Sequence, residues 1–247
     1  MAKDTTTGRK YRGYTINNGQ DGNLHCHTTT LDQIIDTVEL MAAKHSKVFS
    51  VRLDIQNTAT GRIGNNGQEI DYTLDSKDMT RIIESATRTL NSKSKNGKND
   101  PDVHWVWTAE KTSPDDKPHF HVNAFVNGNA IHNGYSVKEA VSRAVKNKLQ
   151  NANNMPNESY EGLVNFSSSN GAKGKLIERN SPEAEDQIND VVFAGSYLAK
   201  VRTKEFNPKG SRVSSCTRIK KSGSSGFSVG NRAQACWGWR SKPPQKK

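Results

Sequence analysis

The sequence predicts an α+β fold, in which a central and mainly antiparallel sheet carries flanking helices. Two observations favour this class. Segments with strand composition flank a segment of helical periodicity, and two further strand segments are joined by a short turn and followed by more helices. A strand, a tight turn and a strand make an antiparallel hairpin. The apolar fraction of 32% is low but sufficient for one modest core.

The first part of the chain contains one helix between two strands. Residues 1–30 form a polar N-terminal segment with a short strand near residues 14–16. Thr30 can cap a helix over residues 31–46, in which apolar residues recur at helical spacing. The stretch KVFSVRLDI, residues 47–55, has the β-branched and aromatic residues typical of a strand.

The middle of the chain is expected to form a hairpin between two helices. Periodic apolar residues predict helices over residues 76–90 and 136–150. Between them, residues 104–112 (HWVWTAEKT) and 118–128 (PHFHVNAFVNG) have the composition of strands. The connection TSPDDK is rich in turn residues, so these strands pair as neighbours.

The last third of the chain is more polar. Residues 151–188 have few apolar anchors and are expected to form a polar insertion. A fourth helix is expected to begin near residue 182 or 190 and to end near residue 204. We therefore expect one domain over residues 31–205 and a basic C-terminal arm over residues 206–247.

The positive charge is concentrated in the last 47 residues. They hold 12 of the 36 Lys and Arg residues but one of the 25 acidic residues, and so carry the whole net charge of +11. Such a segment suits a polyanion, either nucleic acid or an anionic membrane. No apolar run approaches the roughly 18–20 residues of a membrane span. With no secretory signal and no cysteine framework expected, we predict a cytoplasmic protein without a membrane partner.

The clearest local motif is a pair of histidines in a predicted strand. His119 and His121 share one face of that strand, because alternate side chains of a strand do. Glu110 lies across the hairpin and can complete a site of two imidazoles and a carboxylate for Mg²⁺ or Mn²⁺. Asp54 and the turn carboxylates Asp115–Asp116 are alternative ligands, and a pair of solvated histidines is the simpler interpretation.

A tyrosine and a lysine stand one helical turn apart in the fourth predicted helix. Tyr197 and Lys200 therefore share a face. A tyrosine oxygen can attack a phosphodiester when a cation or metal offsets its ordinary pKa of about 10. Lys200 can supply that charge or neutralise the phosphate. A packed tyrosine beside a solvated lysine is the alternative.

Two other motifs have weaker support. Arg52 and Asp54 share one face of their strand, where they form an ion pair, contact DNA or brace a metal-ligand histidine. The stretch His25-Cys26-His27 also spaces two histidines two residues apart. Its polar surroundings show no strand pattern and no carboxylate-bearing partner strand, so no metal site is expected there.

The order of these motifs resembles the HUH endonucleases, the superfamily of rolling-circle replication initiators, relaxases and related transposases. The stretches that carry the resemblance are KVFSVRLDI, HWVWTAEKTSPDDKPHFHVNAFVNG and AGSYLAKVRTK. Within the superfamily, the chain looks most like the initiators of filamentous phages (inoviruses) and their prophage relatives. The resemblance implies a nuclease domain with a variant of the ferredoxin-like, split βαβ fold.

The resemblance also implies roles for single residues. The implied metal ligands are His119, His121 and Glu110. Tyr197 is implied as the nucleophile, and Lys200 as the lysine that often follows it by one turn. Many phage initiators carry a second tyrosine near this helix, which the present sequence lacks. The resemblance therefore implies a single-tyrosine enzyme.

The expected function is that of a replication initiator. It nicks single-stranded or hairpin origin DNA through a 5′-phosphotyrosine intermediate and rejoins strands during rolling-circle replication, with a host helicase and polymerase as partners in a bacterial cell. The residues expected to contact DNA are Arg52, Asp54, Arg202, Lys204, Trp237 and Trp239. The alternatives are a non-cleaving origin-binding regulator on the same fold, a relaxase-type or transposase-type strand transferase, and a metal-dependent hydrolase in which Tyr197 is incidental.

Overall fold

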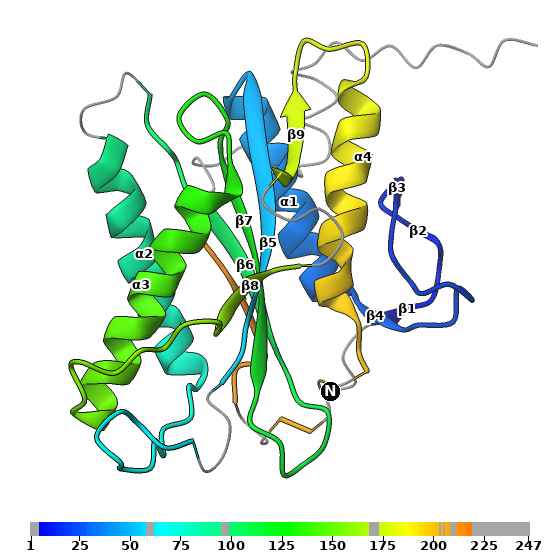
Figure 1. Ribbon diagram of the computed structural model, residues 1–247. Coiled ribbons are helices and arrows are strands. Elements are labelled where there is room, and N and C mark those ends of the chain that lie inside the picture. The colour runs from blue at the N-terminus through cyan, green and yellow to red at the C-terminus, as the bar shows by residue number, and fades with distance from the viewer. Residues whose placement is uncertain are drawn as a thin grey trace, which may run out of the picture.

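The centre of the molecule is an antiparallel sheet of six strands. The structure is a computed structural model, and it describes residues 5–57, 62–94, 99–167, 173–202, 204, 206–207 and 211–218. The strand order is β10-β6-β7-β5-β8, and β9 also pairs with β5. Helices lie on both sides of the sheet (Figure 1). The predicted α+β class with a mainly antiparallel sheet is therefore confirmed.

The elements have the following bounds. The sheet consists of β5 (Lys47–Ile55), β6 (His104–Glu110), β7 (His119–Asn127), β8 (Val164–Phe166), β9 (Lys175–Glu178) and β10 (Ser214–Cys216). The helices are α1 (Thr28–Lys44), α2 (Ser76–Ser94), α3 (Gly134–Asn153) and α4 (Ala184–Gly195), and a 3₁₀ turn follows at Ser196–Ala199. Short N-terminal strands are β1 (Thr5–Thr6), β2 (Lys10–Tyr11), β3 (Tyr14–Thr15) and β4 (Cys26–His27).

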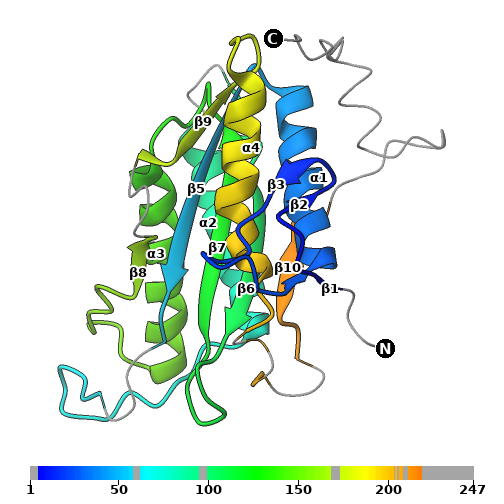
Figure 2. The ribbon, with the colours of Figure 1, turned by 90° about the vertical axis from the view of Figure 1, so that its right-hand side faces the viewer.

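Two cores lie on the two faces of the sheet. On one face, α2 and α3 cover the apolar side chains of the three central strands, among which Trp105, Phe120 and Leu53 are fully buried. On the other face, α1 and α4 cover a smaller core around Val48, Val106 and Phe125. Figure 2 shows α1 and α4 side by side over this second face. The alternation of side chains along each strand supplies both cores at once.

Most predicted elements are present with shifted ends. The hairpin β6–β7 and strand β5 lie where the sequence predicts them. Helix α1 begins at Thr28 rather than at residue 31, so the predicted cap Thr30 is instead a buried residue of its first turn. The fourth helix ends at Gly195 rather than near residue 204.

The segment 151–188 contributes to the sheet. The sequence predicts a polar insertion there, but its few apolar residues form β8 and β9, which pair with opposite ends of β5. The sequence likewise predicts that residues 206–247 form an arm, whereas residues 214–216 form β10 at the edge of the sheet beside β6. Short strands of three or four residues carry too little periodicity to be recognised in a polar stretch.

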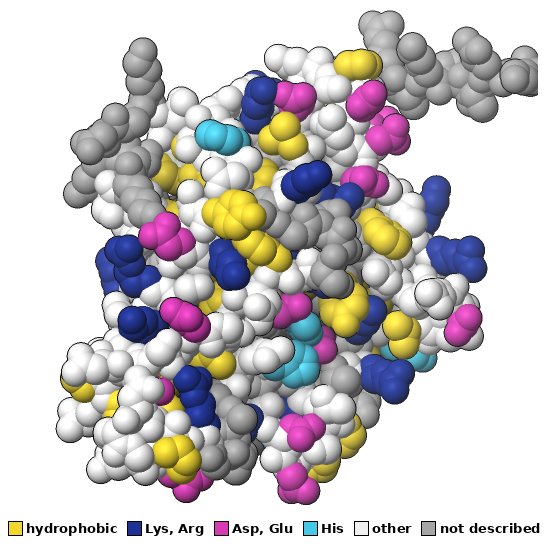
Figure 3. Space-filling model, viewed as in Figure 1, with side chains coloured by type: hydrophobic (Ala, Val, Ile, Leu, Met, Phe, Trp, Pro, Cys, Tyr) yellow, Lys and Arg dark blue, Asp and Glu magenta, His cyan; other side chains and the backbone are white. Residues whose placement is uncertain are grey.

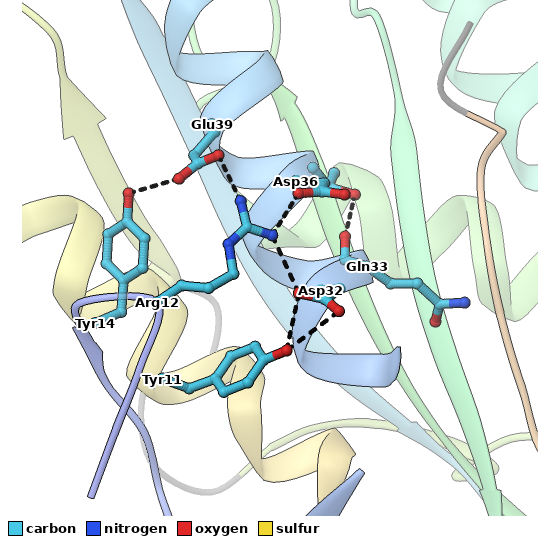
Figure 4. Close-up of polar contacts among 8 residues, drawn as sticks. Tyr11, Arg12, Tyr14, Asp32, Gln33, Asp36 and Glu39 are labelled. Carbon is cyan, nitrogen blue, oxygen red and sulfur yellow. Dashed lines mark hydrogen bonds and ion pairs between the residues drawn. The ribbon is translucent and has the colours of Figure 1, made fainter. Parts of the chain in front are cut away.

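The N-terminal segment is held on α1 by charge. The Arg12 guanidinium contacts Asp36 at 2.6 Å, Glu39 at 3.0 Å and Asp32 at 3.2 Å (Figure 4). These three acidic residues lie at successive turns of one helix face, where they would repel one another without Arg12. The hydroxyl of Tyr14 donates to Glu39 from the same hairpin. These contacts hold the β2–β3 hairpin against α1.

None of the helices in the described part of the chain is long and apolar enough to cross a membrane.

Candidate active site

The α1/α4 face of the sheet changes from apolar to polar along its strands. Its apolar end lies in the second core, and the same face continues beyond that core because alternate residues share a face. The side chains that follow are Arg52 and Asp54 of β5, Thr108 and Glu110 of β6, and His119, His121 and Asn123 of β7. Motifs that are far apart in the sequence therefore meet at one end of one face.

Strand register brings the three predicted metal ligands together. Glu110 lies directly opposite His119 in the β6–β7 hairpin. Its Oε2 is 3.3 Å from Nε2 of His121 and 3.8 Å from Nε2 of His119. Donor atoms of all three residues lie within 4.8 Å of one another. Two imidazole nitrogens and one carboxylate oxygen suit a divalent cation and leave positions open, so this group could hold a metal ion.

The site opens to solvent on the side of His119. The side chain of His119 is 33% exposed, whereas those of His121 and Glu110 are 9% and 7% exposed. Histidine side chains reach the surface beside acidic ones in Figure 3. A ligand bound by the three residues would thus be held from within the sheet and remain reachable from outside.

Asp54 forms a hydrogen bond with His121, one of the three candidate metal ligands. Its Oδ1 is 2.6 Å from Nδ1 of His121, the residue that it faces across β5 and β7. This contact leaves Nε2 of His121 directed toward Glu110, which is the orientation that a carboxylate imposes on a metal-binding histidine. Burial opposes protonation of His121, but the bonds and charges of Asp54 and Glu110 together outweigh it and raise the pKa of His121. The alternative ligands Asp115 and Asp116 are exposed in the turn, outside the group.

A buried lysine holds the other oxygen of Glu110. The Nζ of Lys204 is 3.0 Å from Oε1 of Glu110, and the Lys204 side chain is 2% exposed. Burial would raise the pKa of Glu110, but the bond with His121 and the charge of Lys204 lower it to about 2. Lys204, which the sequence predicts as a DNA contact, is therefore a partner of the ligand carboxylate. No pattern in the sequence indicated this role, because the lysine follows the end of the helix.

Tyr197 lies against the site. Its ring centroid is 5.5 Å from that of His121, and the two rings meet edge to face. The residue belongs to the 3₁₀ turn after α4, and Lys200 follows directly after this turn rather than within a helix. Burial raises the pKa of the Tyr197 phenol, and the charge of Glu110 acts in the same direction. The phenol is therefore protonated at neutral pH before any ligand binds.

A glycine and a serine fix this turn. A Cβ on Gly195 would lie 3.0 Å from side-chain atoms of Asn123 on β7 and of Ile34 on α1, so glycine lets α4 end this close to the sheet without displacing those side chains. The hydroxyl of Ser196 accepts from the backbone N–H of Asn17 at 2.7 Å and donates to the carbonyl of Phe193 at 2.8 Å. Sequence reasoning missed both residues, although they immediately precede Tyr197.

Two cations flank the phenol. The guanidinium carbon of Arg52 is 4.4 Å from the centroid of the Tyr197 ring, and Nζ of Lys200 is 3.6 Å from it. Among the residues that the structure describes, neither cation has an ion-pair partner. Of the alternatives for Arg52 and Asp54, the ion pair between them is not formed, and Asp54 instead contacts the histidine His121. Arg52 and Lys200 thus place two positive charges beside the protonated phenol of Tyr197. Such charges are suited to bind an incoming phosphate.

The remaining candidates lie away from the site or outside the described residues. Arg202 is exposed and follows the end of the 3₁₀ turn by three residues in the sequence. Trp237 and Trp239 are outside the described part of the chain, so their stacking on DNA stays a prediction. In the second histidine motif, His25 is exposed and His27 is buried before α1, and neither belongs to the metal-binding group.

A family model for the YagK/YfjJ C-terminal domain matches residues 6–212. The chain belongs to this family. Its members are prophage-associated proteins, consistent with the phage relationship that the motifs indicate. The match begins at β1 and includes the ligand group, Asp54, Tyr197 and Lys204. No curated protein matches the chain in sequence.

Proposed function

We infer that this member of the YagK/YfjJ C-terminal domain family is a metal-dependent nickase of single-stranded DNA with Tyr197 as its nucleophile. The observation that carries the proposal is the contact of the Tyr197 ring with His121, a member of the group that could hold a metal. A phenol, a candidate metal site and two cations that have no ion-pair partner among the described residues thus lie together at the end of one sheet face. This is the set of groups that transfer of a phosphodiester to tyrosine requires.

The residues would share the work as follows. His119, His121 and Glu110 would hold Mg²⁺ or Mn²⁺, which supplies Lewis-acid polarisation of the scissile phosphate when bound. The Tyr197 oxygen attacks phosphorus and loses its proton to water, and the bond from phosphorus to the 3′ oxygen breaks. The leaving oxygen takes a proton from water, which yields a 5′-phosphotyrosine and a free 3′-hydroxyl. Attack by a 3′-hydroxyl reverses the step and rejoins the strand.

Arg52 and Lys200 would provide electrostatic stabilisation. The negative charge that develops on the phosphate during transfer needs fixed positive charge close to the attacking oxygen. Both side chains already touch the ring of Tyr197, so the phosphate would complete their ion pairs rather than displace existing ones. The charge of Arg52 also counters part of the rise in the pKa of the phenol.

A role as a rolling-circle replication initiator follows from this chemistry. The free 3′-hydroxyl can prime a polymerase, and the covalent link preserves the energy of the broken bond for rejoining. The basic C-terminal residues would bind single-stranded or hairpin origin DNA electrostatically, with a salt-dependent affinity. A host helicase and polymerase would act with it in the bacterial cytoplasm.

The test is the formation of a covalent adduct. Labelled single-stranded oligonucleotides that tile the DNA around the coding gene are incubated with the protein and Mn²⁺, and adducts are resolved on denaturing gels. At least one tile is expected to label the protein, and Tyr197→Phe is expected to abolish the label. Tyr160→Phe is the matched control, because Tyr160 is a buried tyrosine outside the site.

Two results would replace the proposal. If no tile labels the wild-type protein but one of them binds specifically, the chain is a non-cleaving origin-binding protein. If cleavage survives Tyr197→Phe and is lost in His119→Ala, the chain is a metal-dependent hydrolase that uses water.

A further inference from the structure

An exposed aromatic side chain, Tyr135, packs against a partly buried one, Phe166, at the edge of the sheet. Tyr135 in the first turn of α3 is 67% exposed, the highest value among the large apolar side chains of the described residues. Its ring meets that of Phe166 on β8 at a centroid distance of 5.5 Å and an angle of 89°. The Nζ of Lys138 lies 5.2 Å from the centroid of the Phe166 ring. We call Tyr135, Lys138 and Phe166 the edge surface.

The edge surface and the candidate active site lie on opposite faces of the sheet, near the same edge strand β8. Asn165 on β8 lies directly opposite Asp54, the partner of His121. Phe166 follows it, and the N–H of Ser167 donates to the carbonyl of Arg52. Phe166 itself lies opposite Leu53, whose side chain belongs to the core beneath α2 and α3, so the Phe166 ring is on the face of the sheet opposite to Asp54. In Figure 3, hydrophobic and basic side chains lie on the same side of the molecule as the histidines that stand beside acidic groups.

We propose that the edge surface binds the bases of a single DNA strand that passes from the active site around the β8 edge of the sheet. The proposal rests on the proposed function for the identity of the strand, but the binding itself needs neither metal nor Tyr197. The Tyr135 ring offers a face to a base, Phe166 holds that ring in place by the edge-to-face contact, and Lys138 can meet the neighbouring phosphate. Alternating aromatic and basic contacts are how proteins bind single strands without reading their sequence.

The chemistry of the edge surface favours a nucleic acid strand over an apolar protein partner. Two aromatic rings are too small an area for a stable protein interface, which needs about 800 Å² on each side. The cation next to Phe166 supplies a charge that suits a phosphate and that an apolar partner would have to desolvate. The edge surface lies at the β8 edge of the sheet, next to β5, the strand that also carries Arg52 and Asp54 on its other face.

The experiment measures binding alone. The Tyr197→Phe chain is used without metal, so that no strand is cleaved, and its affinity is measured by fluorescence anisotropy for an oligo-dT strand and for an abasic strand of equal length. Tyr135→Ser in this background is expected to weaken binding of oligo-dT about tenfold and to leave binding of the abasic strand unchanged. Tyr135→Phe, which keeps the ring face, is expected to retain the affinity.

Ile63→Ser is the matched control, because Ile63 is 59% exposed and lies in the loop between β5 and α2, outside the edge surface. It is expected to change neither affinity, and thermal unfolding checks that each variant is folded. Equal binding of oligo-dT by the Tyr135→Ser and parent chains would overturn the proposal, as would an equal loss on the abasic strand. A change from dimer to monomer in Tyr135→Ser without DNA would instead make the surface a contact between copies of the chain.

The result is separable from that of the nicking assay. A loss of oligo-dT affinity in Tyr135→Ser supports the edge surface even if no oligonucleotide forms an adduct with Tyr197. Conversely, adduct formation with an unchanged affinity of Tyr135→Ser supports the nickase and removes the edge surface. A 5-iodouracil crosslink mapped to Tyr135 by mass spectrometry would locate the stacked base directly.

Discussion

The chain contains the spacing His-x-His twice, in two very different surroundings. His119 and His121 lie on β7, between β6 and β5, and these neighbours contribute Glu110 and Asp54. His25-Cys26-His27 runs into β4, which has two residues and pairs with Thr5–Thr6 of β1. The His-x-His spacing alone therefore does not make a candidate metal site. A pair of imidazoles becomes part of a candidate metal site where adjacent strands place carboxylates in register with it.

The largest expected effect separates the two motifs directly. His121→Ala is expected to abolish Mn²⁺ binding, because it removes one of three donor atoms and the residue that Asp54 orients. His25→Ala is expected to leave the affinity unchanged. The measurement is titration of the purified protein with Mn²⁺, followed by electron paramagnetic resonance of the free ion. Equal affinity of His121→Ala and the wild type would show that the group does not bind the metal.

The buried ion pair beside the site gives the next largest effect. Lys204→Met keeps the length of the side chain but removes the positive charge that pairs with the buried Glu110. The free energy of unfolding is therefore expected to fall by about 3 kcal/mol. Lys47→Met removes a partner of Glu178 that is largely exposed and should cost less than about 1 kcal/mol. Urea unfolding without metal compares the two.

Mn²⁺ provides a second readout for the same variant. Because a bound cation would supply positive charge next to Glu110, the destabilisation by Lys204→Met is expected to shrink when Mn²⁺ is added. A loss that is the same with and without Mn²⁺ would mean that Lys204 serves packing alone.

The third effect tests support of the ligand from behind. Asp54→Asn keeps the shape of the side chain but weakens the contact with Nδ1 of His121, and is expected to lower Mn²⁺ affinity by about tenfold to a hundredfold. Asp115→Asn, in the exposed turn, is the control and should have no effect. If Asp115→Asn proved the more damaging, the ligand set would have to include the turn.

The strands that build the site could be predicted from the sequence, whereas its surroundings could not. The alternation in β5 and in the β6–β7 hairpin is long enough to assign faces, which sufficed to group Glu110 with His119 and His121. Helix α4 ends where Gly195 approaches Asn123 of β7 closely. This is a tertiary contact, so no pattern in the local sequence predicts it. Lys204 and Glu110 pair although they are 94 residues apart in the chain, and β8 and β9 are too short for periodicity to show.

The smallest expected effect concerns a third group of histidines, at the opposite end of the sheet. Asp102 contacts Lys44 at 2.7 Å and His45 at 2.6 Å, and lies 3.5 Å from His104. Burial would raise the pKa of Asp102, but the bonds with Lys44 and His45 lower it. These residues do not belong to the group that could hold a metal, so Asp102→Asn should leave Mn²⁺ binding unchanged.

The effect of Asp102 on stability should depend on pH. Because the pKa of this carboxyl is lower in the folded chain than the value of about 3.9 expected when unfolded, its contribution is fully present above about pH 5. It is lost as the pH falls through the folded pKa. Asparagine, like aspartate, tolerates the backbone φ of 42° at position 102, so Asp102→Asn adds no backbone strain. The substitution should destabilise the protein by about 1 kcal/mol at pH 6. A difference that did not shrink toward pH 3 in urea unfolding would show that the carboxylate charge is not what holds α1 to β6.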